Sequence, residues 1–226
     1  MPRRDISFNN KGIYHVFTKS IEGKKIFDIN RYCRTFYEIA CYYRSVESKV
    51  SLSAFKRLDK KIQLELLNKM GDPSTYKVSI LAYCFMPNHF HFLIEQNISN
   101  GISSYVSNVL NSFTRYYNIA NNRVGPLFLP KFKAVPVTHE DQLIHVSRYI
   151  HLNPYSSRVI KEQELLGSYR YSSYPFYVSS IPDKLVDNKR VIELFNYDKE
   201  RYRKFIMDNA QHQQMLEACK HAYKWR

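Results

Sequence analysis

Two apolar runs separated by a tight turn constrain the fold of this chain more than any other feature. The first run extends from Val78 to Met86, the turn is Pro87-Asn88, and the second run extends from His89 to Ile94. Proline presets the φ angle that a turn requires, and asparagine tolerates a left-handed conformation. Two β-rich runs joined in this way predict an antiparallel hairpin.

Side-chain alternation along the second run separates two kinds of residue. Phe90 and Phe92 project from one face of the strand and can fill a core, whereas His89 and His91 project from the other face. A His-x-His pair on a strand is more often an ordinary half-exposed pair than a metal site. Two imidazoles at this spacing, at the mouth of a turn, can nevertheless supply half of a metal site.

The charge of the chain favours an acidic polymer as its partner. The 226 residues carry a formal net charge of +14, which suits nucleic acid or, alternatively, an anionic membrane surface. No apolar run reaches the roughly 18 residues that a membrane-spanning helix needs, so we expect no membrane insertion. The N-terminus lacks the apolar stretch of a secretion signal, so we expect a cytoplasmic, nucleoid-associated protein.

Helical periodicity accounts for much of the remaining chain. The predicted helix that contains Tyr149 should end near Asn153, because Pro154 disfavours helical geometry in the residue before it. His145, Tyr149 and Asn153 recur every four residues and therefore share one face of that helix. Apolar residues at helical spacing predict helices at residues 30–46, 51–70, 103–121 and 138–153.

Two further segments are rich in β-forming residues. Residues 14–17 predict a first strand, in which we expect His15 to be hydrogen-bonded to a neighbouring residue. Residues 127–137 carry Lys131 and Lys133 among aromatic side chains. These lysines can bind phosphates while bases stack on the aromatic rings, or they can keep an edge strand soluble.

Several blocks of the chain, in matching order and spacing, resemble the single-tyrosine HUH transposases, and in particular the REP-associated tyrosine transposases. The hairpin block is Met86-Pro87-Asn88-His89-Phe90-His91, and the helix block is Arg148-Tyr149-Ile150-His151-Leu152-Asn153-Pro154. The remaining blocks are Tyr14-His15-Val16-Phe17, Gly125-Pro126-Leu127-Phe128 with Phe132-Lys133, and Tyr171-Ser172-Ser173-Tyr174.

The resemblance implies a fold as well as an activity. It implies an α+β, ferredoxin-like (RRM-like) antiparallel sheet with helices on one face, which forms an HUH nuclease core. We expect this single-tyrosine transposase domain to occupy residues 1–177 and a helical C-terminal extension to occupy residues 178–226. The strands and helices predicted from periodicity are compatible with that arrangement.

The resemblance also assigns roles to individual side chains. It makes His89 and His91 metal ligands, Tyr149 the nucleophile, and Asn153 a third ligand where other branches carry glutamine. The metal would be Mg²⁺ or Mn²⁺; two imidazoles suit Mn²⁺ better, whereas availability in the cell favours Mg²⁺. Attack by the tyrosine on a phosphodiester would store the bond energy in a 5′-phosphotyrosine and release a 3′-hydroxyl.

A tyrosine hydroxyl, whose ordinary pKa is about 10, must lose its proton during such an attack. The metal or a nearby base can assist, and His145 and His151 are the candidate bases on the same helix. Lys131, Lys133 and Arg148 are the candidate DNA-binding residues. Leu129-Pro130-Lys131 stands where the family usually has Gln-Gly-Arg, and this departure concerns substrate recognition more than chemistry.

Three functions compete for this sequence. The first is a metal-dependent enzyme that nicks and rejoins single-stranded DNA at hairpin-forming sites, acting as a monomer or a homodimer. The second is a domesticated DNA-binding protein that keeps the fold without catalysis; the presence of His89, His91 and Tyr149 weighs against it. The third is an RNA-binding module of RRM type, but the aromatic motifs typical of such modules are absent from the sequence.

Overall fold

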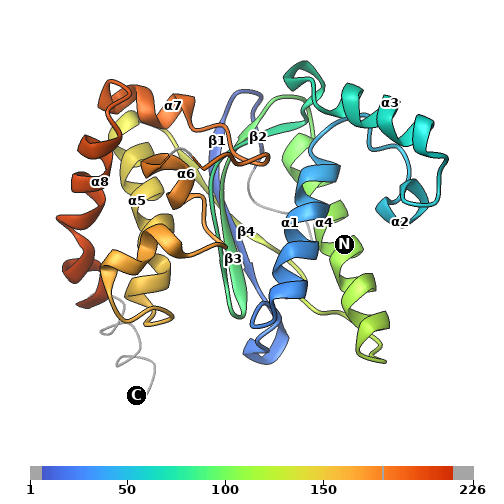
Figure 1. Cartoon of the computed structure of the whole chain (residues 1–226), viewed down its shortest axis with the longest axis horizontal. Coiled ribbons are helices and arrows are strands. Elements are labelled where there is room, and N and C mark those ends of the chain that lie inside the picture. The colour runs from blue at the N-terminus through green and yellow to red at the C-terminus, as the bar shows by residue number, and fades with distance from the viewer. Residues whose placement is uncertain (1–6, 180, 216–226) are drawn as a thin grey trace.

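The computed structural model describes residues 7–179 and 181–215, and it combines a central sheet with helices on either side (Figure 1). The strands are β1 (Ile13–Lys19), β2 (Val78–Met86), β3 (His89–Gln96) and β4 (Lys133–Val137). The α-helices are α1 (Asn30–Tyr43), α2 (Leu52–Phe55), α3 (Lys60–Met70), α4 (Gly101–Ala120), α5 (Glu140–Ser156), α6 (Tyr174–Val178), α7 (Lys189–Ile192) and α8 (Lys199–Met207). Short 3-10 turns lie at Ile21–Gly23, Pro73–Thr75, Gln163–Ser168 and Glu193–Phe195.

The four strands form one antiparallel sheet in the order β2-β3-β1-β4. Apart from the inserted α2 and α3, the strands and α-helices from β1 to β4 follow the β-α-β-β-α-β sequence of the ferredoxin-like motif. The predicted hairpin is β2 and β3, in which Met86 pairs with His89 across the Pro87-Asn88 turn. The predicted α+β fold class is therefore confirmed.

Alternation along β3 places its aromatic and imidazole side chains on opposite faces of the sheet, as the sequence predicts. Phe90 and Phe92 are fully buried and lie 5.1 and 6.5 Å, between ring centroids, from Phe36 of α1. Phe113 of α4 completes this cluster, 5.1 Å from Phe36. Helices α1 and α4 thus cover the phenylalanine face, and His89 and His91 point to the other face.

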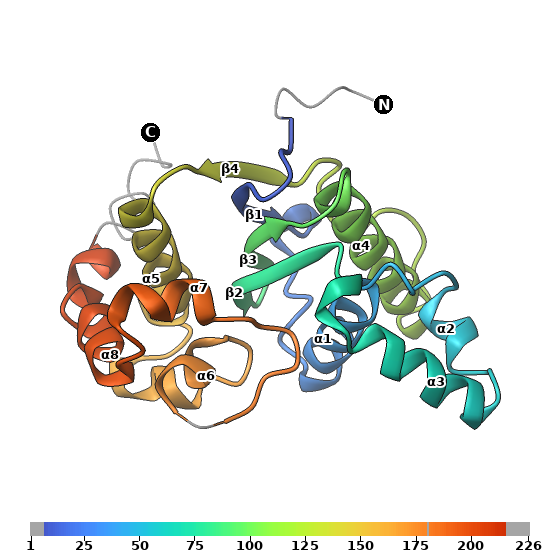
Figure 2. The same cartoon turned by 90° about the horizontal axis from the view of Figure 1, so that it is seen from above.

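A second helical layer, which the prediction of helices on one face does not include, covers the histidine face (Figure 2). Helix α5 packs on β2 and β3, and α6 and α8 pack against each other next to α5. Buried Leu143, Ile150 and Leu152 give α5 the apolar surface that this packing needs. The division at residue 177 falls within α6 and stays a prediction.

Local boundaries differ from the predictions in three places. Helix α5 continues through the buried Pro154 to Ser156, since its end is held by a bond from Ser157 N to Asn153 O and by tertiary packing. The predicted helix at 51–70 is two helices, because Asp59 caps a new start with its carboxylate on the amide of Lys61. Only residues 133–137 of the predicted β-rich segment at 127–137 form a strand.

Candidate functional site

Three histidines lie on one face of the two central strands. The register pairs Phe17 of β1 with His91 of β3, so His15, two residues before Phe17, projects from the same face as His91 and His89. Nε2 of His15 lies 2.9 Å from Nδ1 of His91, a hydrogen-bonding distance. The rings of His89 and His91 are 5.0 Å apart between centroids and nearly perpendicular.

Helix α5 brings Tyr149 against these histidines. Its ring meets His91 edge-on at 5.6 Å and His15 edge-on at 5.7 Å, both between centroids. Tyr149 is half-buried, so the ring is held by its neighbours without being sealed from solvent. The structure therefore brings the predicted nucleophile and the predicted ligand His91 together, although nearly sixty residues separate them in the chain.

Asn153 lies one helical turn after Tyr149 and is 2% exposed. Its amide nitrogen Nδ2 donates to the carbonyl oxygen of Tyr149 over 2.8 Å. This bond fixes the amide orientation and makes Oδ1 the atom with ligand character.

Hydrogen bonds constrain the tautomers of the histidines. Nδ1 of His89 is 2.6 Å from Oδ1 of Asn88, and a carbonyl oxygen only accepts, so Nδ1 carries the proton and Nε2 keeps its lone pair. Burial lowers the pKa of His15 to about 4, so its ring is neutral near pH 7. A neutral His15 can either donate to His91 or accept from it.

The side chains present fit a divalent metal as a partial ligand set. A ligating histidine normally donates its second ring nitrogen to an outer oxygen, as His89 does to Asn88. Within residues 7–179 and 181–215, no group of three or more His, Cys, Asp or Glu side chains is arranged to hold a metal. The predicted set would consist of two imidazoles and an amide oxygen, and water and substrate oxygens would have to complete it.

The candidate DNA-binding residues occupy different surroundings. Lys133 opens β4 opposite Phe17, in the same cross-strand row as His91, and is exposed; Lys131, just before this strand, is exposed too. Arg148 instead faces α8, where its guanidinium lies 4.3 Å from the ring centroid of Phe205. DNA binding by these three residues stays a prediction.

The two candidate bases on α5 both contact other side chains. The ring nitrogens of buried His151 lie 2.7 Å from the hydroxyls of Tyr202 and Ser173, and burial lowers its pKa to about 3. His145 contacts Arg148 through Nδ1. Both nitrogens of His151 are engaged in this buried network, which weighs against His151 as the base, and the identity of the base stays a prediction.

Sequence reasoning missed the place of His15 in this site. The expected hydrogen bond to a neighbour is found, but the neighbour is the predicted ligand His91. The sequence did contain one signal: His15 and Phe17 are two residues apart on a predicted strand, so their side chains project from the same face. That signal places His15 beside His91 only when the pairing of β1 with β3 is known.

Comparisons with known proteins agree with this architecture. Residues 42–153 match the family model described as "Transposase IS200 like". A solved structure titled "Structure of the REP associates tyrosine transposase bound to a REP hairpin" superposes with a TM-score of 0.52 at 14% identity, covering 83% of this chain and 92% of that chain. No curated protein matches the sequence. These findings confirm the family resemblance and the shared fold.

None of the helices in the described part of the chain is both long enough and apolar enough to cross a bilayer.

Proposed function

Taking this chain as a member of the IS200-like transposase family, we propose that it is a metal-dependent enzyme that cleaves and rejoins single-stranded DNA at hairpin-forming sites. The observation that carries the proposal is the placement of Tyr149 edge-on to His91 and His15. A hydroxyl nucleophile beside imidazole ligands is the arrangement that tyrosine-dependent phosphodiester cleavage needs. The protein whose fold this chain shares was solved with a hairpin, which supports hairpin DNA as the substrate class.

Tyr149 supplies the covalent step. Its oxygen forms a bond to the phosphorus as the bond from phosphorus to the 3′ oxygen breaks. The products are a 5′-phosphotyrosine and a free 3′-hydroxyl, which takes up the proton that the tyrosine loses. Reversal by the same or another 3′-hydroxyl rejoins DNA without an external energy source, because the phosphodiester energy is kept in the protein–DNA bond.

His89, His91 and Oδ1 of Asn153 would hold the metal. When bound, a divalent ion such as Mn²⁺ or Mg²⁺ neutralises the anionic phosphate oxygens and orients the scissile bond. The hydrogen bond from His89 to Asn88 supports this role, because it presents the lone pair of His89 Nε2.

His15 acts as a positioning residue for His91. If His91 donates its Nδ1 proton to His15, Nε2 of His91 keeps the lone pair that a metal ligand needs. The opposite direction would protonate Nε2 of His91 and block it. We assign the first direction, because it is the one compatible with ligation, and a neutral His15 can accept such a bond.

We expect the protein to act on DNA in the cytoplasm, at the nucleoid, as a monomer or a homodimer. The basic charge of +14 supports an association with DNA.

Incubation with labelled hairpin oligonucleotides and Mn²⁺ tests this proposal. Wild-type protein should form a covalent adduct that survives denaturing electrophoresis, and Tyr149→Phe should form none while it still binds the hairpin. Tyr155→Phe, on the same helix and also half-buried, is the matched control and should retain the adduct. Cleavage without an adduct would indicate a water-using nuclease, and hairpin binding without cleavage in either protein would indicate a non-catalytic DNA-binding protein. Either result would overturn the proposal.

A further inference from the structure

The turn of α5 that carries Tyr149 and Asn153 is followed directly by a proline. Pro154 has no N–H group, so it cannot donate to the carbonyl of Ile150 four residues earlier, and its ring crowds that carbonyl. A proline inside a helix usually kinks it or ends it. The proposed nucleophile and the proposed amide ligand therefore lie on a turn that has lost part of its backbone hydrogen bonding.

Gln213 bridges the two sides of this proline from outside α5. It belongs to the helical segment 210–215, which follows α8, and it is 8% exposed. Its side-chain nitrogen Nε2 donates to the carbonyl oxygen of Tyr149 over 3.1 Å and, more weakly, to the hydroxyl oxygen of Ser156 over 3.5 Å. An amide NH₂ has two protons, so both bonds can form at once. One buried amide thus connects a residue before Pro154 with a residue after it.

Two further side-chain amides act on the same part of α5. Nε2 of Gln214 donates to the carbonyl oxygen of Tyr155 over 3.2 Å. Nδ2 of Asn153 donates to the carbonyl oxygen of Tyr149 over 2.8 Å, the same oxygen that accepts from Gln213. The orientation of the Asn153 amide therefore depends on a carbonyl group that Gln213 holds in place.

The segment that carries Gln213 is itself attached to the core. Ala210, three residues before Gln213, is fully buried. Helix α8, which precedes this segment, is joined to α5 through Tyr202, whose hydroxyl lies 2.7 Å from Nδ1 of His151 and 3.1 Å from Oγ of Ser147. Gln213 is thus presented to α5 by a packed part of the chain, and its hydrogen bonds can constrain the helix.

We propose that Gln213 is a positioning residue for the cleavage reaction: by bridging Pro154, it fixes the backbone from which Tyr149 and Asn153 project. The inference rests on the proposed function and deepens it, since it gives the segment after α8 a role in the reaction. A displacement of a reacting group by about 1 Å can reduce a rate by about 100-fold. Loss of the bridge should therefore affect the rate of the covalent step more than the affinity for DNA.

The rate of adduct formation and the affinity for the hairpin test this proposal together. In single-turnover reactions with Mn²⁺ and a labelled hairpin oligonucleotide, Gln213→Ala should form the adduct about 10- to 100-fold more slowly than wild type. Its hairpin affinity, measured by fluorescence anisotropy, should stay unchanged, because the substitution leaves the net charge of the protein at +14. Gln211→Ala replaces an exposed glutamine of the same segment and is the matched control, which should react at the wild-type rate.

Gln213→Glu distinguishes hydrogen bonding from packing. The side chain keeps its size and shape, but an ionised carboxylate only accepts hydrogen bonds and cannot donate to the carbonyl of Tyr149. A protonated carboxyl can donate through its O–H group, and burial beside acceptor oxygens favours this protonated form. The rate of Gln213→Glu relative to wild type should therefore be low at about pH 8 and recover as the pH falls toward about 5. The ratio cancels the titrations that the two proteins share.

The outcomes separate this inference from the proposed function. Adduct formation by Gln213→Ala at the wild-type rate, with Tyr149→Phe inactive, would overturn the positioning role and leave the cleavage proposal standing. A slow Gln213→Glu whose ratio to wild type is the same at every pH would also overturn it, since the side chain would then act through packing. Wild-type protein that forms no adduct would overturn both proposals.

The supporting result is a slow Gln213→Ala with normal hairpin affinity, together with recovery of Gln213→Glu at low pH and a normal Gln211→Ala. Circular dichroism would check that each variant is folded. If Gln213→Ala does not fold, the pH dependence of Gln213→Glu decides the question by itself.

Discussion

The positioning role of His15 gives the most specific prediction of this structure. Replacement of His15 by phenylalanine keeps a ring of similar size beside Phe17 and Tyr149, which lie 4.9 and 5.7 Å away between centroids. It removes only the 2.9 Å hydrogen bond to Nδ1 of His91. The fold should therefore persist, and the proton of His91 should no longer be held on Nδ1.

The size of the effect follows from that single bond. An intramolecular hydrogen bond makes a net contribution of about 1 kcal/mol to stability. Removal of the outer partner of a ligating histidine typically weakens metal binding by about 10- to 100-fold. Each factor of ten corresponds to about 1.4 kcal/mol, so the Mn²⁺ affinity of His15→Phe should fall by roughly 1.4 to 2.8 kcal/mol. His15→Gln should recover part of this affinity, since its amide oxygen can accept from Nδ1 of His91.

Two assays check this prediction without reference to activity. Titration calorimetry would measure Mn²⁺ affinity, and nitrogen NMR of the metal-free protein would report which ring nitrogen of His91 carries the proton. His212→Phe, an exposed histidine outside the site, is the control. Unchanged affinity in His15→Phe, or a wild-type His91 already protonated on Nε2, would refute the reasoning.

The proposed ligands, the lysines near β4 and the buried His151 give three further predictions. His89→Ala and His91→Ala should each abolish adduct formation with Mn²⁺, while their circular dichroism spectra stay native. If both variants cleave at the wild-type rate, the assignment of these histidines as metal ligands is wrong. Lys131→Ala with Lys133→Ala should reduce the slope of log affinity against log salt by about 0.7 for each phosphate that is no longer neutralised, whereas replacement of two exposed lysines of α3 should not. Because burial lowers the pKa of His151 from 6.5 to about 3, only the unfolded chain takes up that proton between these pH values. The free energy of unfolding should thus fall as the pH drops through this window, and urea titrations of His151→Gln should show a shallower fall.

Local sequence rules determined the parts of this protein that depend on neighbouring residues. The Pro87-Asn88 turn between two apolar runs was enough to predict the hairpin. The alternation after the turn separated Phe90 and Phe92 from the two histidines of β3, because the face from which a strand residue projects depends only on its position along the strand. Helical spacing likewise put Tyr149 and Asn153 on one face of α5, and the structure keeps them one turn apart.

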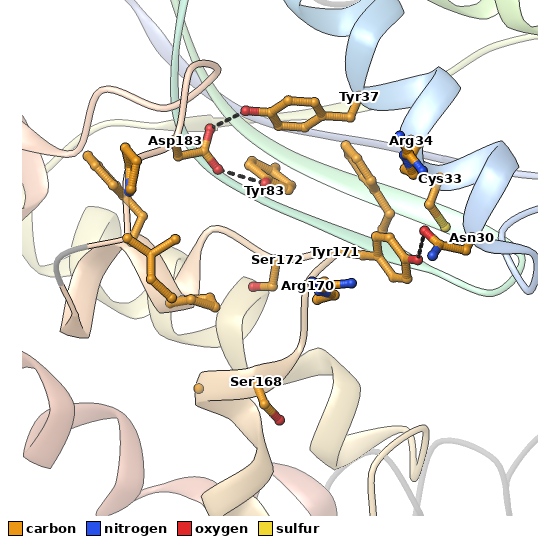
Figure 3. A pocket seen from close by; sticks show the side chains of 16 residues that line it. Asn30, Cys33, Arg34, Tyr37, Tyr83, Ser168, Arg170, Tyr171, Ser172 and Asp183 are labelled. Carbon is orange, nitrogen blue, oxygen red and sulfur yellow. Dashed lines mark hydrogen bonds between the residues drawn. The ribbon is translucent and has the colours of Figure 1, made fainter.

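Tertiary structure decided what local rules could not. His15 becomes a partner of His91 only through the register of β1 against β3, and α5 passes Pro154 because packing and the hydrogen bonds at its end outweigh a local helix-breaking preference. Arg34 of α1 and Arg170 line one cleft of the structure (Figure 3), although they are more than 130 residues apart in the chain. Juxtapositions of this kind depend on which surfaces the whole chain buries together, and that choice is made by the summed packing of the core rather than by any short segment.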